Sequence, residues 1–209
     1  MIDNLPFTYP WLIKRNIKKF KINTILDLGC GKGAFGDLVN NEGKYQITGA
    51  DIFQPYLKIC KSGGKYKKVM KVDLIKKLPF DDKSFDMVVS LQTVEHLDKK
   101  DGFLLIKEME RIAKTLILLT TPNGDCLQEE YDANKYQRHL SAWLPKDFKG
   151  KGFRVFGTGL KLVYGSHSHA GNEIKLIQLP LYFISFLMNP VANINPNIAA
   201  QVIAIKWKK

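Results

Sequence analysis

Short apolar runs alternate with segments whose apolar residues recur at helical spacing through the first 120 residues of the chain. An apolar run of strand length indicates a buried strand, and apolar positions three or four residues apart indicate the buried face of a helix. Strands are predicted at 24–28, 45–50, 66–71, 85–91 and 115–120, and helices at 33–41, 53–62 and 98–113. This alternation predicts an α/β domain in which helices cover both faces of a parallel sheet.

The alternation ends after residue 122, and the rest of the chain is less regular. A polar insertion runs to Lys135, an amphipathic segment at 141–148 leads to a predicted strand at 152–158, and a last strand is predicted at 199–207. The segment 176–188 is strongly apolar but too short for a membrane-spanning helix, which needs about 20 residues. We expect a lid or a packing segment there, with weak contact to a membrane surface as the alternative.

A glycine-rich turn follows the first predicted strand, in the sequence Ile25-Leu-Asp-Leu-Gly-Cys-Gly-Lys-Gly-Ala-Phe-Gly36. Glycines let the backbone approach a ligand closely, and the helix that follows points free N–H groups at an anionic group. The turn therefore predicts a nucleotide-binding site. Asp51, at the end of the second strand, can accept hydrogen bonds from both hydroxyls of an adenosine ribose, a group that NAD and adenosyl ligands share.

Further motifs follow along the chain, and together they distinguish between these ligands. They are Asp27-Leu-Gly-Cys-Gly-Lys-Gly33, Asp51, Asp73, Leu78-Pro-Phe80, Phe85-Asp-Met-Val-Val89 and Glu95-His-Leu97. In this combination, residues 22–122 resemble the class I S-adenosylmethionine-dependent methyltransferases, of the methyltransferase type 11 kind and an uncharacterised microbial subgroup. The resemblance implies a Rossmann-like three-layer α/β sandwich, whose mostly parallel seven-stranded sheet has an antiparallel last strand.

The resemblance also implies which residues hold S-adenosylmethionine, and S-adenosylhomocysteine after the reaction. The glycines of the turn line the methionine part, and Asp27 lies near its amino group. Asp51 binds the ribose, while Asp73 and its neighbour Leu74 contact the adenine. The complete implied set is Asp27, Gly29, Gly31, Gly33, Asp51, Ile52, Asp73, Leu74, Leu91 and Gln92.

The acceptor of the methyl group leaves weaker traces in the sequence. His96 and His139 are candidate general bases, because histidine exchanges protons near neutral pH. Candidate acceptor contacts are Tyr136, Gln137 and Trp143, in a segment that resembles a motif of uncharacterised microbial methyltransferases. The alternative is that each histidine has a structural role. For Trp143 the alternative is that it anchors the following helix instead of contacting the acceptor. Ala133 and Ala142 stand where this motif leads us to expect glycines.

Residues 90–97 contain neither the Pro-Pro-aromatic loop of base N-methyltransferases nor the cysteine nucleophile of cytosine C5 enzymes. We therefore expect a small-molecule acceptor, methylated at oxygen or nitrogen. The alternatives are an RNA methyltransferase and a noncatalytic S-adenosylmethionine-binding protein. An NAD-dependent oxidoreductase is less favoured, because no Tyr-Lys or His-Asp arrangement stands where one is expected.

Composition changes this picture little. The formal net charge is +12, but it comes from 28 dispersed Lys and only 4 Arg, so nucleic acid is a partner that the sequence allows but does not favour. The three cysteines are far apart, and the paired histidines at 166–169 lack a nearby acidic partner, so we expect no metal site. We expect a cytoplasmic protein because no leader pattern is recognisable.

The length of 209 residues, of which 45% are hydrophobic, is enough for one domain with a sizeable core. We expect a single methyltransferase domain with four parts. These are an N-terminal cap segment (1–22), the cofactor-binding core (23–122), acceptor-side insertions (123–198) and the last strand (199–209). The sequence makes no prediction of the oligomeric state.

Overall fold

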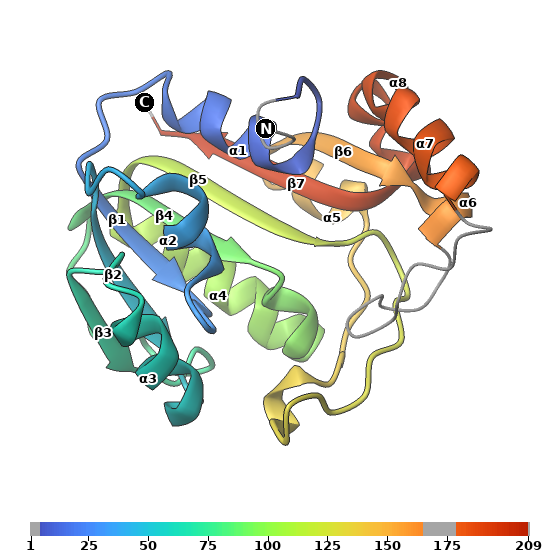
Figure 1. Ribbon diagram of the computed structural model, residues 1–209. Coiled ribbons are helices and arrows are strands. Elements are labelled where there is room, and N and C mark those ends of the chain that lie inside the picture. Colours follow the sequence, from blue (N-terminus) through green and yellow to red (C-terminus); the bar gives the residue numbers. More distant parts are fainter. Residues whose placement is uncertain (1–4, 165–178, 209) are drawn as a thin grey trace.

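The computed structural model describes residues 5–164 and 179–208, and its centre is a seven-stranded sheet (Figure 1). The strands are β1 (Thr24–Leu28), β2 (Gln46–Asp51), β3 (Lys68–Lys71), β4 (Phe85–Leu91), β5 (Ala113–Pro122), β6 (Arg154–Leu160) and β7 (Ala199–Trp207). Their order across the sheet is β3-β2-β1-β4-β5-β7-β6. The strands from β3 to β5 in this order are parallel, whereas β7 runs antiparallel to both of its neighbours. The predicted sheet with an antiparallel last strand is confirmed.

The helices lie on both faces of this sheet (Figure 1). They are α1 (Tyr9–Ile17), α2 (Ala34–Val39), α3 (Gln54–Ser62), α4 (Lys99–Ile112), α5 (Pro145–Lys149), α6 (Lys161–Tyr164), α7 (Leu179–Leu187) and α8 (Asn189–Ile194). Three short 3-10 turns are η2 (Val94–His96), η3 (Lys135–Gln137) and η5 (Pro196–Ile198).

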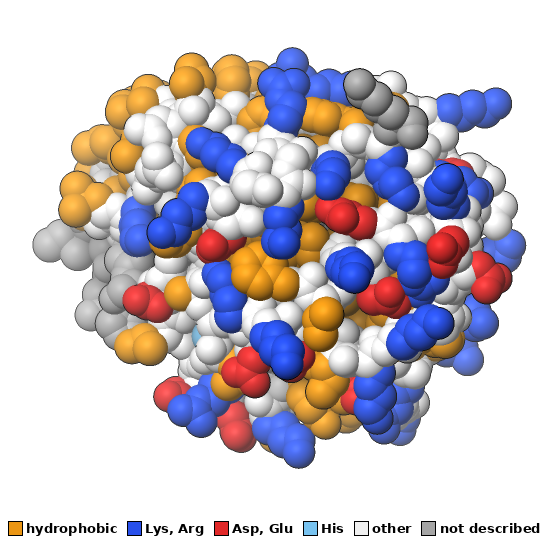
Figure 2. Space-filling view, turned by 180° about the vertical axis from the view of Figure 1, so that it is seen from behind, with side chains coloured by type: hydrophobic (Ala, Val, Ile, Leu, Met, Phe, Trp, Pro, Cys, Tyr) orange, Lys and Arg blue, Asp and Glu red, His pale blue; other side chains and the backbone are white. Residues whose placement is uncertain are grey.

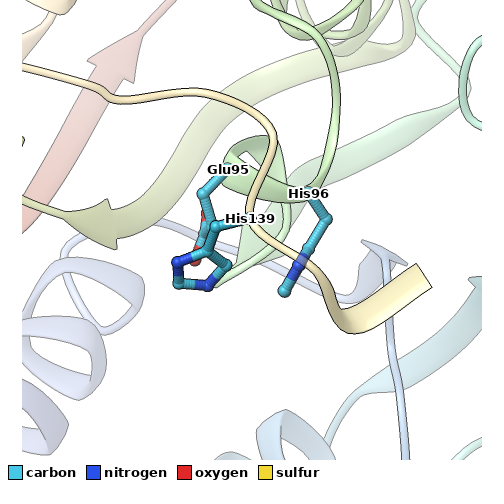
Figure 3. Close-up of side chains that lie close together, drawn as sticks. All are labelled: Glu95, His96 and His139. Atoms are coloured by element: carbon cyan, nitrogen blue, oxygen red, sulfur yellow. The ribbon is translucent and has the colours of Figure 1, made fainter. Parts of the chain in front are cut away.

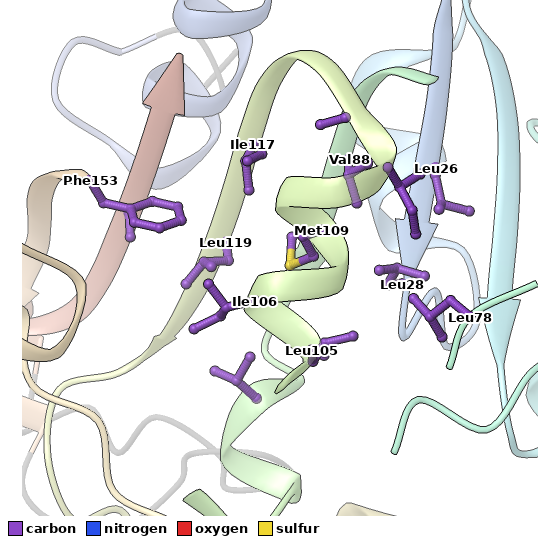
Figure 4. Close-up of a cluster of buried hydrophobic side chains, with 14 of the residues drawn as sticks. Leu26, Leu28, Leu78, Val88, Leu105, Ile106, Met109, Ile117, Leu119 and Phe153 are labelled. Carbon is purple, nitrogen blue, oxygen red and sulfur yellow. The ribbon is translucent and has the colours of Figure 1, made fainter. Parts of the chain in front are cut away.

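Alternate residues of the central strands point to two separate cores, as expected for a sheet covered on both sides. Leu26 of β1 packs with Leu105 and Met109 of α4 in one core (Figure 4). Ile25, the preceding residue, packs with Ile13 of α1 in the other core. All five side chains are fully buried. The helices thus fix the sheet from both sides and leave only its ends open to a ligand.

The apolar segment near the C-terminus is helical where the structure describes it. Five side chains of α7 are half exposed or more, namely Leu179, Leu181, Phe183, Ile184 and Leu187. Hydrophobic side chains gather on the corresponding edge of the molecule (Figure 2). Within the described residues, the structure has no helix of sufficient length and apolar character to cross a membrane. Residues 176–178 of the predicted segment and the histidine pair at 166–169 lie outside the described residues.

The turn after β1 has a tight steric constraint at Gly29. A Cβ atom on this residue would lie 2.3 Å from Oγ1 of Thr93, and its φ of +76° is left-handed. Thr93 is β-branched, and its hydroxyl donates a hydrogen bond to the Leu91 carbonyl (3.0 Å), so it cannot easily turn away. Gly31 is also left-handed (φ +51°), but a Cβ there would meet no atom within 4 Å.

We expect Gly29→Ala to lower the free energy of unfolding by about 2–4 kcal/mol, because overpacking adds to the backbone cost. Gly31→Ala is the matched control and should lose only about 1 kcal/mol, the backbone cost alone. Urea denaturation of both variants measures the difference. Equal losses would show that contact with Thr93 does not constrain the turn.

Candidate functional site

A cavity of about 750 Å³ lies where the carboxyl ends of β1, β2 and β4 meet, which is the usual ligand position in an open α/β sheet. Its wall includes the predicted residues Asp27, Gly29, Gly31, Asp51, Ile52, Asp73, Leu74, Leu91 and Gln92. Gly33 is not part of this wall. It is the residue before α2, and a Cβ there would pack against Cys60 and Tyr66. The sequence motifs therefore converge on one cavity, with Gly33 behind it.

The Asp51 carboxylate is oriented by two backbone donors. The N–H of Gly31 donates to Oδ2 and the N–H of Phe53 donates to Oδ1, both at 2.9 Å. Each carboxylate oxygen has two lone pairs, so both oxygens can still accept one more hydrogen bond. Burial raises the pKa of this carboxyl above its usual value. The arrangement presents a pair of acceptors in a fixed position to the cavity.

Asp27 is almost completely buried at the end of β1, with 1% of its surface exposed. The Tyr66 hydroxyl donates to its Oδ2 at 2.6 Å, and the Gly36 N–H donates to the Tyr66 hydroxyl at 3.1 Å. Burial raises the pKa of Asp27 to about 7, against the opposing effect of the Tyr66 hydrogen bond. The sequence analysis missed Tyr66, because no motif connects residues 39 positions apart.

The end of β4 is shaped by Gln92, whose backbone is left-handed with a φ of 50°. Its side-chain amide donates to Oγ1 of Thr120 (3.0 Å) and to Oε1 of Gln201 (2.8 Å). These bonds fix Gln92 to β5 and β7. The chain bends at Gln92 and soon enters η2, which carries His96 on the cavity wall.

His96 and His139 are 43 positions apart in the sequence, yet their ring centroids lie 4.9 Å apart (Figure 3). Nδ1 of His96 lies 3.1 Å from the Arg138 carbonyl oxygen, and Nδ1 of His139 contacts the Cys126 carbonyl oxygen. Burial lowers the pKa of His96 to about 4 and also lowers the pKa of His139. Both rings are therefore neutral at pH 7, and only His96 belongs to the cavity wall.

The predicted acceptor contacts divide into two groups. Tyr136 and Gln137, from η3, are part of the cavity wall. Trp143 is not: it is fully buried, it stacks on Phe148 with ring centroids 5.3 Å apart, and its Nε1 donates to the Val94 carbonyl (3.2 Å). Trp143 supports the insertion from beneath, so the predicted contact between Trp143 and the acceptor has to be corrected to a packing role.

Two further contacts join the insertion to the glycine turn and to α3, and the sequence analysis missed both. Lys32 forms an ion pair with Asp132, and the Tyr56 hydroxyl donates to Oδ2 of Asp132 at 3.0 Å. Ala133, where a glycine was expected, has a left-handed φ of 52°, so the backbone here does take the conformation that favours glycine. These contacts hold the insertion next to the exposed side of the cavity.

Comparisons with known proteins relate this part of the chain to methyltransferases. Residues 26–116 match a family model described as a methyltransferase domain. The chain is 30% identical over 115 residues to a probable 18S rRNA (guanine-N(7))-methyltransferase of Dictyostelium discoideum, covering 54% of this chain and 40% of that protein. It is 32% identical over 141 residues to ajmaline N-methyltransferase of Rauvolfia serpentina, covering 59% and 47%, respectively.

Among solved structures, a SAM-dependent methyltransferase from Archaeoglobus fulgidus matches with a TM-score of 0.58 and 22% identity. This match covers 99% of this chain and 98% of that one, so the same fold extends over both. The chain spans less than two thirds of the length of the curated relatives that it matches.

The raised pKa of Asp27 predicts a pH dependence of stability. In the unfolded chain this carboxyl ionises near its ordinary pKa of 3.8, whereas in the folded chain it keeps its proton up to about pH 7. The folded state therefore binds more protons in this window, and the contribution of Asp27 to stability falls as the pH rises from about 4 to about 7.

We expect the free energy of unfolding of Asp27→Asn, relative to the unsubstituted protein, to increase by a few kcal/mol from pH 4.5 to pH 7.5. Denaturant titrations of both proteins at the two pH values measure this difference. A difference that stays constant with pH would show that Asp27 ionises normally in the folded protein.

Proposed function

We propose that this chain is a class I S-adenosylmethionine-dependent methyltransferase and that it transfers a methyl group to an oxygen or nitrogen atom of a small molecule. The observation that carries this proposal is the convergence of three carboxylates on one cavity, at Asp27, Asp51 and Asp73. Asp27 lies near the end of β1, Asp51 is the last residue of β2, and Asp73 follows β3; the carboxyl ends of these three strands meet at one edge of the sheet. Each would recognise a different part of the same ligand.

The chemistry of these groups fits S-adenosylmethionine along its length. The Asp51 carboxylate would accept both ribose hydroxyls, while Ile52 would pack on the adenine. Asp73 would accept the adenine amino group, and the buried Asp27 would face the cationic amino group of the methionine part. The backbone at Gly29 and Gly31 leaves room for that part against the turn.

Methyl transfer from a sulfonium is an in-line displacement, so the protein contributes mainly alignment and exclusion of water. The acceptor attacks the methyl carbon, and the bond from that carbon to sulfur breaks. Tyr136 and Gln137 would hold the acceptor near the end of β4, where Leu91 and Gln92 line the cavity. His96, the predicted general base on the cavity wall, is neutral at pH 7 because burial lowers its pKa to about 4, and the same low pKa makes it a weak base.

The face of the molecule drawn in Figure 2 supports a small molecule over RNA as the acceptor. Lysine and arginine side chains are scattered among acidic and neutral ones on the face seen in Figure 2, and they do not form a single basic stripe. RNA recognition usually depends on a clustered basic surface. The similarity to an rRNA methyltransferase keeps RNA as the second candidate. A noncatalytic S-adenosylmethionine-binding protein would bind the cofactor without any turnover.

We expect Asp51→Ala to bind S-adenosylhomocysteine about 10- to 100-fold more weakly, because it removes two hydrogen bonds to a charged group. Isothermal titration calorimetry measures this affinity, with NAD as the comparison ligand. Asp81→Ala is the matched control, because this exposed carboxylate lies outside the cavity wall. Thermal denaturation shows whether each variant is folded. Equal affinity in the two variants, or tight binding of NAD, would contradict the proposal.

We also expect binding of S-adenosylhomocysteine to weaken as the pH falls from 8 to 5.5. Only the ionised Asp27 attracts the cationic amino group of the ligand, and its pKa of about 7 puts this change in the measured range. The affinity should fall by up to about tenfold per pH unit below pH 7. Asp27→Asn should bind more weakly at pH 8 and show little dependence on pH. Parallel pH profiles for the two proteins would exclude this role.

A further inference from the structure

A cluster of three side chains beside the cavity has no role in the cofactor site. Glu95 and His96 come from η2, and His139 comes from the insertion after β5. Each offers a ligand atom, and these atoms all lie within 4.8 Å of one another (Figure 3). The sequence analysis predicted no metal site, because 43 positions separate the two histidines and no spacing motif joins them.

The Glu95 carboxylate is buried and lacks a well-formed hydrogen bond. Only 2% of the residue is exposed, and neither carboxylate oxygen has a hydrogen-bond partner of ordinary geometry among the described residues, although its own backbone N–H and the Thr121 hydroxyl lie close enough to oppose the effect of burial on its pKa. An unpaired buried polar group costs about 1–3 kcal/mol, and more when it is charged. Buried carboxylates are usually compensated by a donor or by a cation. The Glu95 carboxylate therefore requires a compensating donor or cation.

Each histidine that faces Glu95 has its Nδ1 next to a backbone carbonyl. A carbonyl can only accept, so the proton of a neutral ring in this contact lies on Nδ1, and Nε2 of His139 keeps a free lone pair. The same contact leaves Nε2 as the remaining ligand atom of His96, although the backbone of Gln92 and of Gln137 also lies within reach of that ring. Metal-binding histidines commonly have this arrangement, in which the second nitrogen donates to a backbone carbonyl and fixes the ring.

We propose that Glu95, His96 and His139 bind one divalent transition metal ion. Two imidazoles and one carboxylate suit zinc, cobalt, iron or manganese better than magnesium or calcium, which prefer oxygen ligands. Metal–ligand distances of about 2.0–2.2 Å place two ligands of one ion roughly 4 Å apart at most. Small side-chain movements bring the three ligand atoms from their present separation to that range.

The position of the ion also suggests the class of acceptor, an inference that depends on the proposed methyltransferase activity. Three protein ligands leave coordination positions open, and His96 places the ion next to the cavity wall. A hydroxyl group of the acceptor would bind there, and the ion would lower its pKa. The hydroxyl proton leaves to solvent, the oxygen attacks the methyl carbon, and the carbon–sulfur bond breaks to give S-adenosylhomocysteine.

The test is a titration of the full chain with Co²⁺ alone, followed by visible absorption and calorimetry. We expect one Co²⁺ per chain in the unsubstituted protein, and affinities at least about tenfold weaker in Glu95→Gln and in His139→Ala. The double variant His167→Ala/His169→Ala removes the other two histidines of the sequence and should keep the unsubstituted affinity. It is the matched control for binding outside the cluster.

S-adenosylhomocysteine is titrated into the same samples without metal, because its binding residues do not include the cluster. Unchanged S-adenosylhomocysteine affinity in a variant shows that its fold is intact and that its loss of Co²⁺ is specific. No Co²⁺ binding by the unsubstituted protein overturns the metal site, as does binding that is lost only in the double variant. If the unsubstituted protein does not bind S-adenosylhomocysteine, the proposed function is overturned instead.

Discussion

The site depends on the close packing of the turn after β1 against the ends of β2 and β4. The N–H groups of Gly29 and Cys30 both donate to the Ala50 carbonyl at the end of β2, at 2.8 and 3.2 Å. Thr93 fills the space on the other side, beyond the end of β4. A side chain at position 29 has no room between them. The three strand ends are thereby held around one cavity, and the acidic residues at the ends of β1 and β2 are part of its wall.

Burial gives the site its electrostatic character. Asp27 and Glu95 are almost fully removed from solvent, and burial raises the pKa of both, to about 7 and about 8. Burial lowers the pKa of His96 in the same region. Low solvent access therefore favours the neutral form of each group until a charged ligand arrives. Tyr66 donates a hydrogen bond to Asp27, whereas neither carboxylate oxygen of Glu95 has a hydrogen bond of ordinary geometry among the described residues, and this contrast separates the proposed cofactor contact from the proposed metal ligand.

Much of the fold could be predicted from the sequence because its signals are local. The strands expected at 24–28, 85–91 and 199–207 occur at those residues, and the helix expected at 53–62 begins one residue later. The glycine turn and Asp51 could be assigned to one cavity because their positions after β1 and β2 imply it. Contacts across long stretches of chain carried no such signal: Tyr66 on Asp27, and His139 beside His96. Trp143 could not be placed either, because an aromatic residue in a loop can equally face a ligand or the core.

The most direct test of the central claim is a crystal structure of the protein with S-adenosylhomocysteine. The account predicts the ribose hydroxyls on the Asp51 carboxylate, the amino group of the homocysteine part near Asp27, and the sulfur atom near Leu91 and Gln92. The ligand bound elsewhere, or in the cavity with the ribose away from Asp51, would contradict it.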